Sequence, residues 1–133
     1  TVAIRAQHAG FFDVWQYSWS VLDREQAPPV KFTITHRAIQ RALTPMRAWL
    51  AADAGRAQRL SQVTGIDLAE EGALGDLLLG AAMANNPAGI TLVGSRQQSR
   101  VKANARLLGE PGIVVAGQRL SGALEREAGV PWL

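Results

Sequence analysis

The stretch GITLV, residues 89–93, is the feature that most constrains the fold of this chain. It is almost wholly apolar, and such runs are typical of parallel strands that are covered on both faces. Gly94 and Ser95 follow it directly, and a polar segment with helical character occupies residues 95–109. A strand that leads through a short turn into a helix is the repeating unit of α/β folds. The stretch therefore predicts a parallel sheet with helical connections.

The rest of the chain repeats this alternation. Apolar, aromatic and β-branched residues predict two further strands, FFDVWQYS at 11–18 and KFTIT at 31–35. Helices are predicted at residues 2–9, 36–43, 45–53, 56–63, 68–85, 95–109 and 117–129. There is no internal repeat and no linker that divides the chain. The predicted class is α/β, with residues 1–133 as one unit.

Prolines and caps set the expected element boundaries. Thr44 and Pro45 resemble an N-cap followed by proline at the first helical position, so a new helix is expected there. Pro28 and Pro29 leave room for only a short helix, or none, before the second strand. Asp67 is the expected N-cap of the 68–85 helix, the longest predicted, and the Asn-Asn-Pro at 85–87 is its expected end.

Composition excludes several classes of protein. The chain has 133 residues, 47% of them hydrophobic, which suits one globular domain with a core. No apolar run approaches the ~20 residues of a membrane helix, and no signal peptide is recognisable. The absence of cysteine excludes disulfides and thiol catalysis and fits a cytoplasmic location. Because the chain begins with Thr1 rather than Met, it is expected to be processed or a fragment.

The basic residues do not form the pattern of a nucleic-acid binder. The formal net charge is +3, and 12 of the 14 basic residues are arginines scattered from Arg5 to Arg126 among acidic residues. A nucleic-acid interface usually clusters its basic residues and interleaves aromatic ones. Nucleic-acid binding is therefore kept only as the last of three alternatives.

The residues after the GITLV strand have the character of an anion site. Gly94 lets backbone approach a ligand, and Ser95 is expected to cap the following helix. Arg96 and Arg100 are four residues apart, so both can reach one phosphate, and Asn104 extends the same helix face by another turn. Ligands of α/β proteins bind beyond the carboxyl ends of the strands. The alternative is a solvated helix face with a capped start, and spacing alone favours neither.

The sequence LVGSRQQSRVKANARLL, residues 92–108, resembles the cofactor segment of the aldo-keto reductases. In that family Gly-Ser-Arg is followed by an Arg and then an Asn in the helix after the eighth barrel strand. FDVWQYSWSVLD (12–23) resembles the sixth strand, FTITHRAI (32–39) the seventh, and MANNPAGITLVGSR (83–96) the approach to the eighth. Order and spacing agree across nearly the whole chain.

The resemblance implies the C-terminal half of a TIM (β/α)8 barrel that transfers hydride between NADPH and a carbonyl or an alcohol. It implies that Ser95, Arg96 and Arg100 hold the adenosine 2′-phosphate and that Asn104 contacts the adenine. At Gly94 many relatives have a lysine, so one positive charge of the phosphate site is absent here.

Two residues of the predicted strands complete the implied cofactor site. Gln16 would hydrogen-bond the nicotinamide carboxamide, and His36 would lie against the nicotinamide ring, where relatives have an aromatic residue. Ala103 stands where many relatives have a glutamate that contacts the adenine.

The family's catalytic Asp, Tyr, Lys and His belong to the first half of the barrel. A complete barrel needs ~250 residues. Tyr17, Lys31, Lys102 and His8 do not match the catalytic positions. The chain is therefore expected to be inactive alone and to need the missing N-terminal half or another copy of itself, because an open half-barrel exposes strand edges.

The remaining candidates concern substrate and metal. Trp19 follows the first strand and Trp132 lies in the C-terminal tail, so they are the expected contacts of a small carbonyl substrate, although packing is the commoner role of tryptophan. His8 and His36 lack further ligands, so no metal site is expected. A non-catalytic nucleotide-binding or regulatory module resembling the same family is the second alternative.

Overall fold

A computed structural model describes residues 11–23 and 30–133. Three strands form a parallel sheet in the order β1 (Val14–Ser18), β2 (Phe32–His36) and β3 (Ile90–Leu92). The described helices are α2 (Ala38–Ala51), α3 (Ala54–Thr64), α4 (Ala73–Asn85), α5 (Gln98–Leu107) and α6 (Pro111–Leu124). The predicted α/β class with parallel strands is confirmed. The helix predicted at 2–9 and the break predicted at Pro28 and Pro29 lie outside the described residues.

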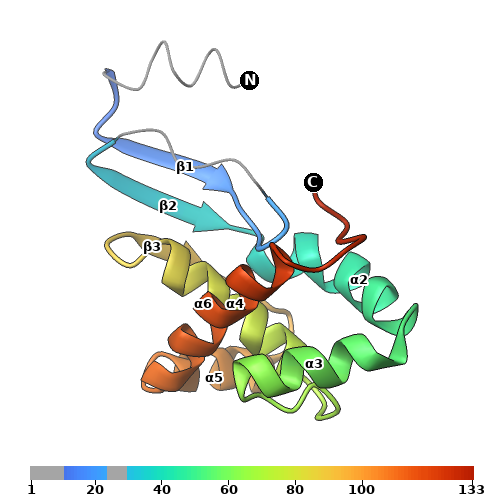
Figure 1. The fold of residues 1–133 in the computed structure, drawn as a ribbon. Coiled ribbons are helices and arrows are strands. Elements are labelled where there is room, and N and C mark those ends of the chain that lie inside the picture. Colours follow the sequence, from blue (N-terminus) through green and yellow to red (C-terminus); the bar gives the residue numbers. More distant parts are fainter. Residues whose placement is uncertain (1–10, 24–29) are drawn as a thin grey trace.

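The helices lie on one side of the sheet (Figure 1). The register pairs Gln16 with Ile34 and Ile34 with Ile90, and successive side chains of a strand point to opposite faces. The face that we call the open face therefore carries Val14, Gln16, Ser18, Phe32, Ile34, His36, Ile90 and Leu92. The opposite, helix-covered face carries Trp15, Tyr17, Thr33, Thr35 and Thr91.

The main core lies between the covered face and the helices. Its fully buried large side chains include Leu22, Met46, Leu60, Leu77, Leu78, Leu120 and Leu124. Helices α4 and α6 cross at two glycines, because a Cβ atom on Gly80 would collide with backbone of Ile113 and one on Gly117 would collide with backbone of Gly80 and Ala81. The crossing is therefore as close as backbone allows, and it forms the centre of the helical layer.

Asn86 holds β3 beside β2. Its side-chain Nδ2 donates to the backbone oxygens of Thr33 and Ile90, both at 3.2 Å, and its Oδ1 accepts from the Thr33 hydroxyl at 2.5 Å. The predicted helix end at residues 85–87 is confirmed, since α4 ends at Asn85. The buried amide thus pairs with backbone oxygens of both β2 and β3 and links the two strands.

The prediction that both faces of the third strand are covered is wrong. Ile90 is 45% exposed and Leu92 is 46% exposed, because no described helix packs on the open face. The first strand is also shorter than the predicted 11–18, and Val14 at its start is exposed. The apolar run indicated a strand buried on both faces, but the open face of β3 has no described helix packed on it and stays exposed.

The helix boundary predicted at Thr44 and Pro45 is wrong as well. Helix α2 continues through Pro45, and its buried residues Ala38, Ala42, Met46 and Trp49 lie on one helical stripe. A proline inside a helix costs about 3 kcal/mol. Burial of Met46 and Trp49 against the core offsets this cost. Both side chains face the core because α2 stays continuous through Pro45.

Helices α3, α4 and α6 also differ from their predicted ends. Helix α4 begins at Ala73 rather than at residue 68, because Gly72 has φ 85°, which interrupts a right-handed helix. Asp67 caps a turn instead, accepting from the Ala69 N–H at 2.9 Å. Helix α6 spans Pro111–Leu124 rather than 117–129. Helix α3 is longer than the predicted 56–63, since Asp53 provides its N-cap.

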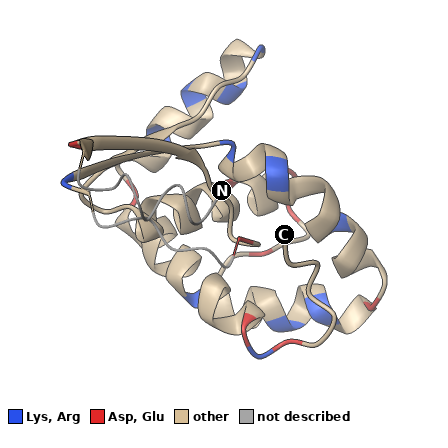
Figure 2. Ribbon diagram, turned by 90° about the horizontal axis from the view of Figure 1, so that it is seen from above, with Lys and Arg blue, Asp and Glu red and all other residues tan. Residues whose placement is uncertain are grey.

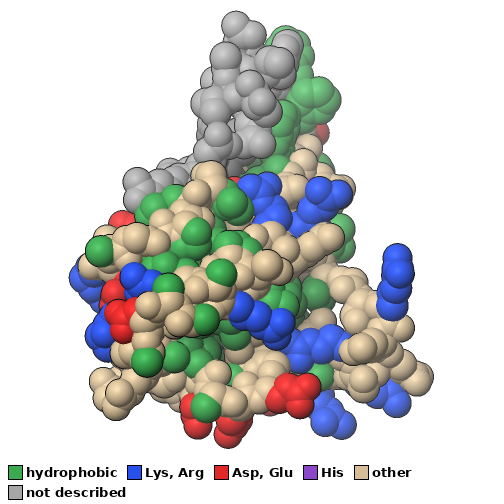
Figure 3. Space-filling view, turned by 90° about the vertical axis from the view of Figure 1, so that its right-hand side faces the viewer, with side chains coloured by type: hydrophobic (Ala, Val, Ile, Leu, Met, Phe, Trp, Pro, Cys, Tyr) green, Lys and Arg blue, Asp and Glu red, His purple; other side chains and the backbone are tan. Residues whose placement is uncertain are grey.

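Charged residues are spread over the helices, with acidic and basic positions interspersed (Figure 2). Apolar side chains also reach the surface between charged ones (Figure 3). Among the described residues, no helix combines the length and the apolar character that a bilayer crossing requires.

Candidate functional site

A hollow of about 810 Å³ opens at the carboxyl ends of β2 and β3. We call it the polar hollow. The predicted site residues that line it are His36, Gly94, Ser95, Arg96, Arg100 and Asn104. The other lining residues are Arg37, Ala38, Ile39, Gln40, Leu92 and Val93. These residues come from the ends of β2 and β3, the start of α2, the loop after β3 and helix α5, and no acidic residue is among them.

The Gly-Ser-Arg segment lies in the loop after β3 and lines the polar hollow. No helix begins at Ser95. The Ser95 hydroxyl accepts from the Gln97 N–H at 3.1 Å, and α5 begins only at Gln98. The prediction that Ser95 caps the helix is therefore wrong, because its hydroxyl closes a local turn. Arg96 lies in this turn and Arg100 in the helix, so the two arginines reach one hollow without sharing a helix face.

Arg100 is already engaged within the fold. Its Nη2 donates to Oδ1 of Asp76 on α4 at 2.9 Å, and both side chains are about 30% exposed. Within residues 11–23 and 30–133, Arg96 and Arg37 form no ion pair and are exposed. The polar hollow thus combines one anchored guanidinium with two unengaged ones.

Asn104 is the most buried polar residue of the hollow. It is 6% exposed, and its Oδ1 is buried without a hydrogen-bond partner within the described structure. An unsatisfied buried acceptor costs about 1–3 kcal/mol. The spacing of Asn104 from Arg100 placed both on one side of α5, and both do line the polar hollow.

Arg37 lines the polar hollow but was not predicted from the sequence. It is the N-cap of α2, and its φ of 64° is the only positive φ of a non-glycine residue in the described part of the chain. That backbone turns the chain sharply from β2 into α2 and places Arg37 in the wall of the polar hollow. The sequence placed Arg37 within the helix predicted at 36–43, and nothing in an arginine identifies a left-handed conformation.

Gln16 and the two predicted substrate residues lie outside the polar hollow. Gln16 is on the open face, where it shares that face with His36 of the neighbouring strand. Trp19 is 6% exposed in the main core, and Trp132 packs against the same core. Packing is thus the role that the structure supports for both tryptophans.

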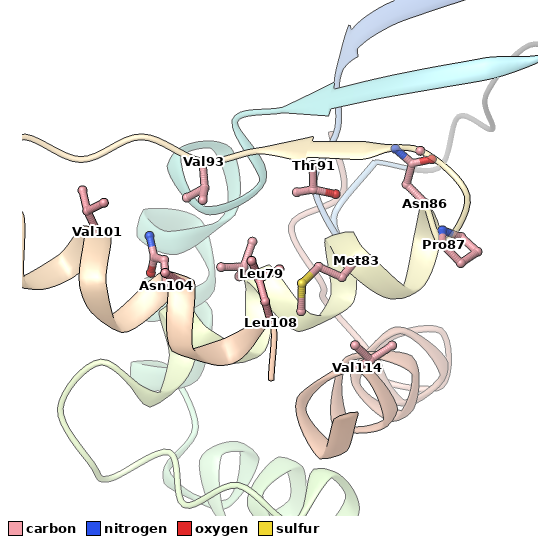
Figure 4. Close-up of a pocket in the computed structure, with 12 residues that line it drawn as sticks. Leu79, Met83, Asn86, Pro87, Thr91, Val93, Val101, Asn104, Leu108 and Val114 are labelled. Atoms are coloured by element: carbon pink, nitrogen blue, oxygen red, sulfur yellow. The ribbon is translucent and has the colours of Figure 1, made fainter. Parts of the chain in front are cut away.

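A second, mostly apolar pocket of about 580 Å³ lies on the covered side of β3 (Figure 4). Thr91 of β3 and Val93 just after that strand line it, together with Leu79 and Met83 of α4. Val101, Asn104 and Leu108 line it from α5 and its end. Asn104 therefore stands in the wall between this apolar pocket and the polar hollow.

Asp53 and Arg59, at the N-cap and within α3, lie away from both cavities. Asp53 has a lowered pKa, first because its carboxylate accepts from the Gly55 N–H and then because Arg59 is adjacent. Asp53 and Arg59 belong to an exposed cluster with Glu127. The described residues contain no group of three or more His, Asp or Glu side chains placed to hold a metal ion.

The fold and the polar hollow define the class as an α/β protein with a parallel sheet and a basic cavity at the carboxyl edge of that sheet. The chain matches none of the protein-family models, curated proteins or solved structures with which it was compared.

Proposed function

We propose that this chain is the C-terminal half of an NADPH-dependent aldo-keto reductase barrel and that the polar hollow binds the adenosine 2′-phosphate of NADPH. The observation that carries the proposal is the convergence of His36, the Gly-Ser-Arg loop, Arg100 and Asn104 on one basic cavity. These residues come from segments more than fifty positions apart in the sequence. The cavity lies beyond the carboxyl ends of parallel strands, where α/β proteins bind their ligands.

The open face supports the half-barrel. Parallel sheets are almost always covered on both faces, yet here one face presents Val14, Ile90 and Leu92 to solvent. In a closed barrel the inward side chains of all strands fill the interior. Five further strands would give these apolar residues such an interior, and they would come from the N-terminal half that the proposal requires.

The polar hollow fits the phosphate end of the cofactor. Arg96 and Arg37 are unengaged, and the guanidinium fork matches phosphate oxygens. The buried Asn104 Oδ1 without a partner is an acceptor suited to an exocyclic amino group. Gln16 and His36 share the open face and would contact the nicotinamide end. When bound, NADPH would supply hydride to an aldehyde or ketone, and the residues of this chain would bind and orient the cofactor.

The catalytic acid must come from outside this chain. Tyr17 points to the covered face, and neither Lys31 nor Lys102 lines the polar hollow. We therefore expect no turnover by this chain alone. The same observation keeps the second candidate function open, a non-catalytic module that binds the nucleotide and never reduces a substrate.

The proposal is tested by fluorescence titration of the chain with NADPH and NADH. We expect NADPH to bind more tightly than NADH, and we expect Arg96→Ala to remove most of that preference, about tenfold or more for one charge-assisted contact. Arg106→Ala is the matched control, since Arg106 lies on α5 but does not line the polar hollow. Equal losses for NADPH and NADH in Arg96→Ala would rule out the 2′-phosphate role.

Adding a separately expressed N-terminal half separates the two candidate functions. NADPH oxidation in the presence of an aldehyde would support the reductase. Binding without oxidation in the reassembled protein would support the non-catalytic module.

A further inference from the structure

Asp76 lies at a place where it can control the orientation of Arg100. Asp76 is in the first turn of α4, 24 residues before Arg100 in the sequence, and its Oδ1 accepts from Arg100 Nη2 at 2.9 Å. Asp76 does not itself line the polar hollow, whereas Arg100 does. A carboxylate that binds one side of a guanidinium leaves the donors on its other sides free.

Two glycines make room for the guanidinium beside Asp76. A Cβ atom on Gly75 would lie 2.5 Å from Arg100 Nη2, and one on Gly72 would lie 3.0 Å from Nη1. The Arg100 side chain therefore rests directly on the backbone at the start of α4. Any side chain at Gly75 would push the guanidinium away from Asp76. We call Gly72, Gly75 and Asp76 the arginine seat.

The seat needs its carboxylate for an electrostatic reason. The N-terminus of a helix carries partial positive charge and disfavours a nearby cation. Arg100 lies against the start of α4, so Asp76 supplies the negative charge that makes this position favourable. The ion pair between Asp76 and Arg100 is partly exposed, so it contributes little to the stability of the fold. Its main effect is to hold the Arg100 guanidinium in place.

We propose that Asp76 is a positioning residue that presents Arg100 to the phosphate in the polar hollow, and that the arginine seat thereby sets the preference for a 2′-phosphorylated nucleotide. This inference rests on the proposed function. The positioning role and simple charge counting predict opposite results for removal of the Asp76 carboxylate. Charge counting alone predicts stronger anion binding, because an acid beside a basic cavity is lost. The positioning role predicts a weaker preference for the 2′-phosphate, because Arg100 loses its anchor.

The test measures binding of 2′,5′-ADP and of 5′-AMP to the full chain by calorimetry. In Asp76→Asn and in Gly75→Ala we expect the ratio of the two affinities to fall by about tenfold, the scale of one charge-assisted hydrogen bond. Gly75→Ala changes no charge, and alanine is favourable within a helix, so a loss of preference there would not reflect a weaker α4. Glu71→Gln is the control, because it removes an exposed acidic charge near the same helix start. Asp76→Glu, which keeps the carboxylate, should recover part of the preference.

A second readout follows the seat without any nucleotide. Phenylglyoxal modifies accessible arginines, and peptide mass spectrometry reports the rate at each site. Arg100 should react faster in Asp76→Asn and Gly75→Ala than in the wild type, while the rate at Arg96 should stay the same. Unchanged reactivity of Arg100 would overturn the seat.

The two readouts distinguish the failures. An unchanged or increased 2′-phosphate preference in Asp76→Asn, in a wild type that shows the preference, would overturn the positioning role. A wild type that does not discriminate between the two nucleotides would overturn the proposed function, and with it the link to 2′-phosphate preference. The phenylglyoxal rates would then be the only test of whether Gly75 and Asp76 hold Arg100 in the arginine seat.

Discussion

At the scale of single residues, side chains of the same type have different roles in this chain. Arg96 and Arg100 line the same polar hollow, yet only Arg100 is paired, to Asp76. Ser95 and Asp53 both resemble N-caps. Asp53 does cap α3, accepting from the Gly55 N–H at 2.8 Å, whereas Ser95 closes a turn before its helix. Whether such a residue caps a helix therefore depends on the position of the first helical residue, which the type of the capping residue does not determine.

Asp53 offers a pH-dependent prediction. Its folded-state pKa is lowered below 3.8, chiefly by the Gly55 hydrogen bond and then by Arg59. The stability that it contributes is therefore complete above its unfolded pKa and is lost as the pH falls below 3.8 through the lowered folded value. Asn keeps the cap but cannot titrate. Urea unfolding from about pH 6 down to about pH 2 should show a smaller acid-induced loss for Asp53→Asn than for the wild type. Parallel pH profiles for the two proteins would contradict this account.

At the scale of elements, the contact between α4 and α6 depends on glycine. Gly80 and Gly117 let the helices approach until backbone meets backbone. Glycine is a poor helix residue, so its position at this crossing is explained by space rather than by propensity. The α4 sequence predicted a helix, but nothing in its local pattern identified α6 as the partner.

Gly117→Ala should destabilise the fold by about 1–3 kcal/mol, because the added methyl group collides with the backbone of α4. Gly122→Ala is the matched control on the same helix, since its added Cβ would meet only Arg126 Nη1, at 4.0 Å. That control should be neutral or more stable by up to about 1 kcal/mol. Urea denaturation of both variants measures the difference. Equal stability of the two would mean that the helices can separate without cost.

At the scale of the whole molecule, the sheet has helices on only one face. The open face carries apolar side chains from all three strands, and β3 is an edge with unpaired backbone in the described structure. Exposed apolar edges pair with other chains. The open face therefore predicts that the chain associates with further copies or partners.

The isolated chain should self-associate through the open face, and sedimentation velocity would detect this. Ile90→Lys should reduce the association, because it places a charge on the apolar edge strand and removes none of the polar hollow. Val63→Lys is the control, since Val63 is similarly exposed, 41% against 45% for Ile90, but lies on α3. A monodisperse wild-type monomer with a cooperative thermal transition would contradict the half-barrel proposal.

The candidate site was predictable in part. The Gly-Ser-Arg segment, Asn104 and His36 were identified from residue type, spacing and resemblance, and they line one hollow. Arg37 and Asp76 were not identified. Arg37 enters the wall through a left-handed backbone, and Asp76 meets Arg100 across 24 residues of intervening chain.

The sequence by itself determined what depends on near neighbours. Apolar and β-branched runs, the Asn-Asn-Pro helix end and the glycine after β3 act over a few residues, so the strands, most helices and the parallel α/β class followed from them. Only the tertiary structure decided which faces are covered, whether α2 runs through Pro45, and where the Arg100 guanidinium rests. Burial and ion pairing are properties of segments brought together from distant positions, and their free energies outweigh the local preferences that a sequence pattern reports.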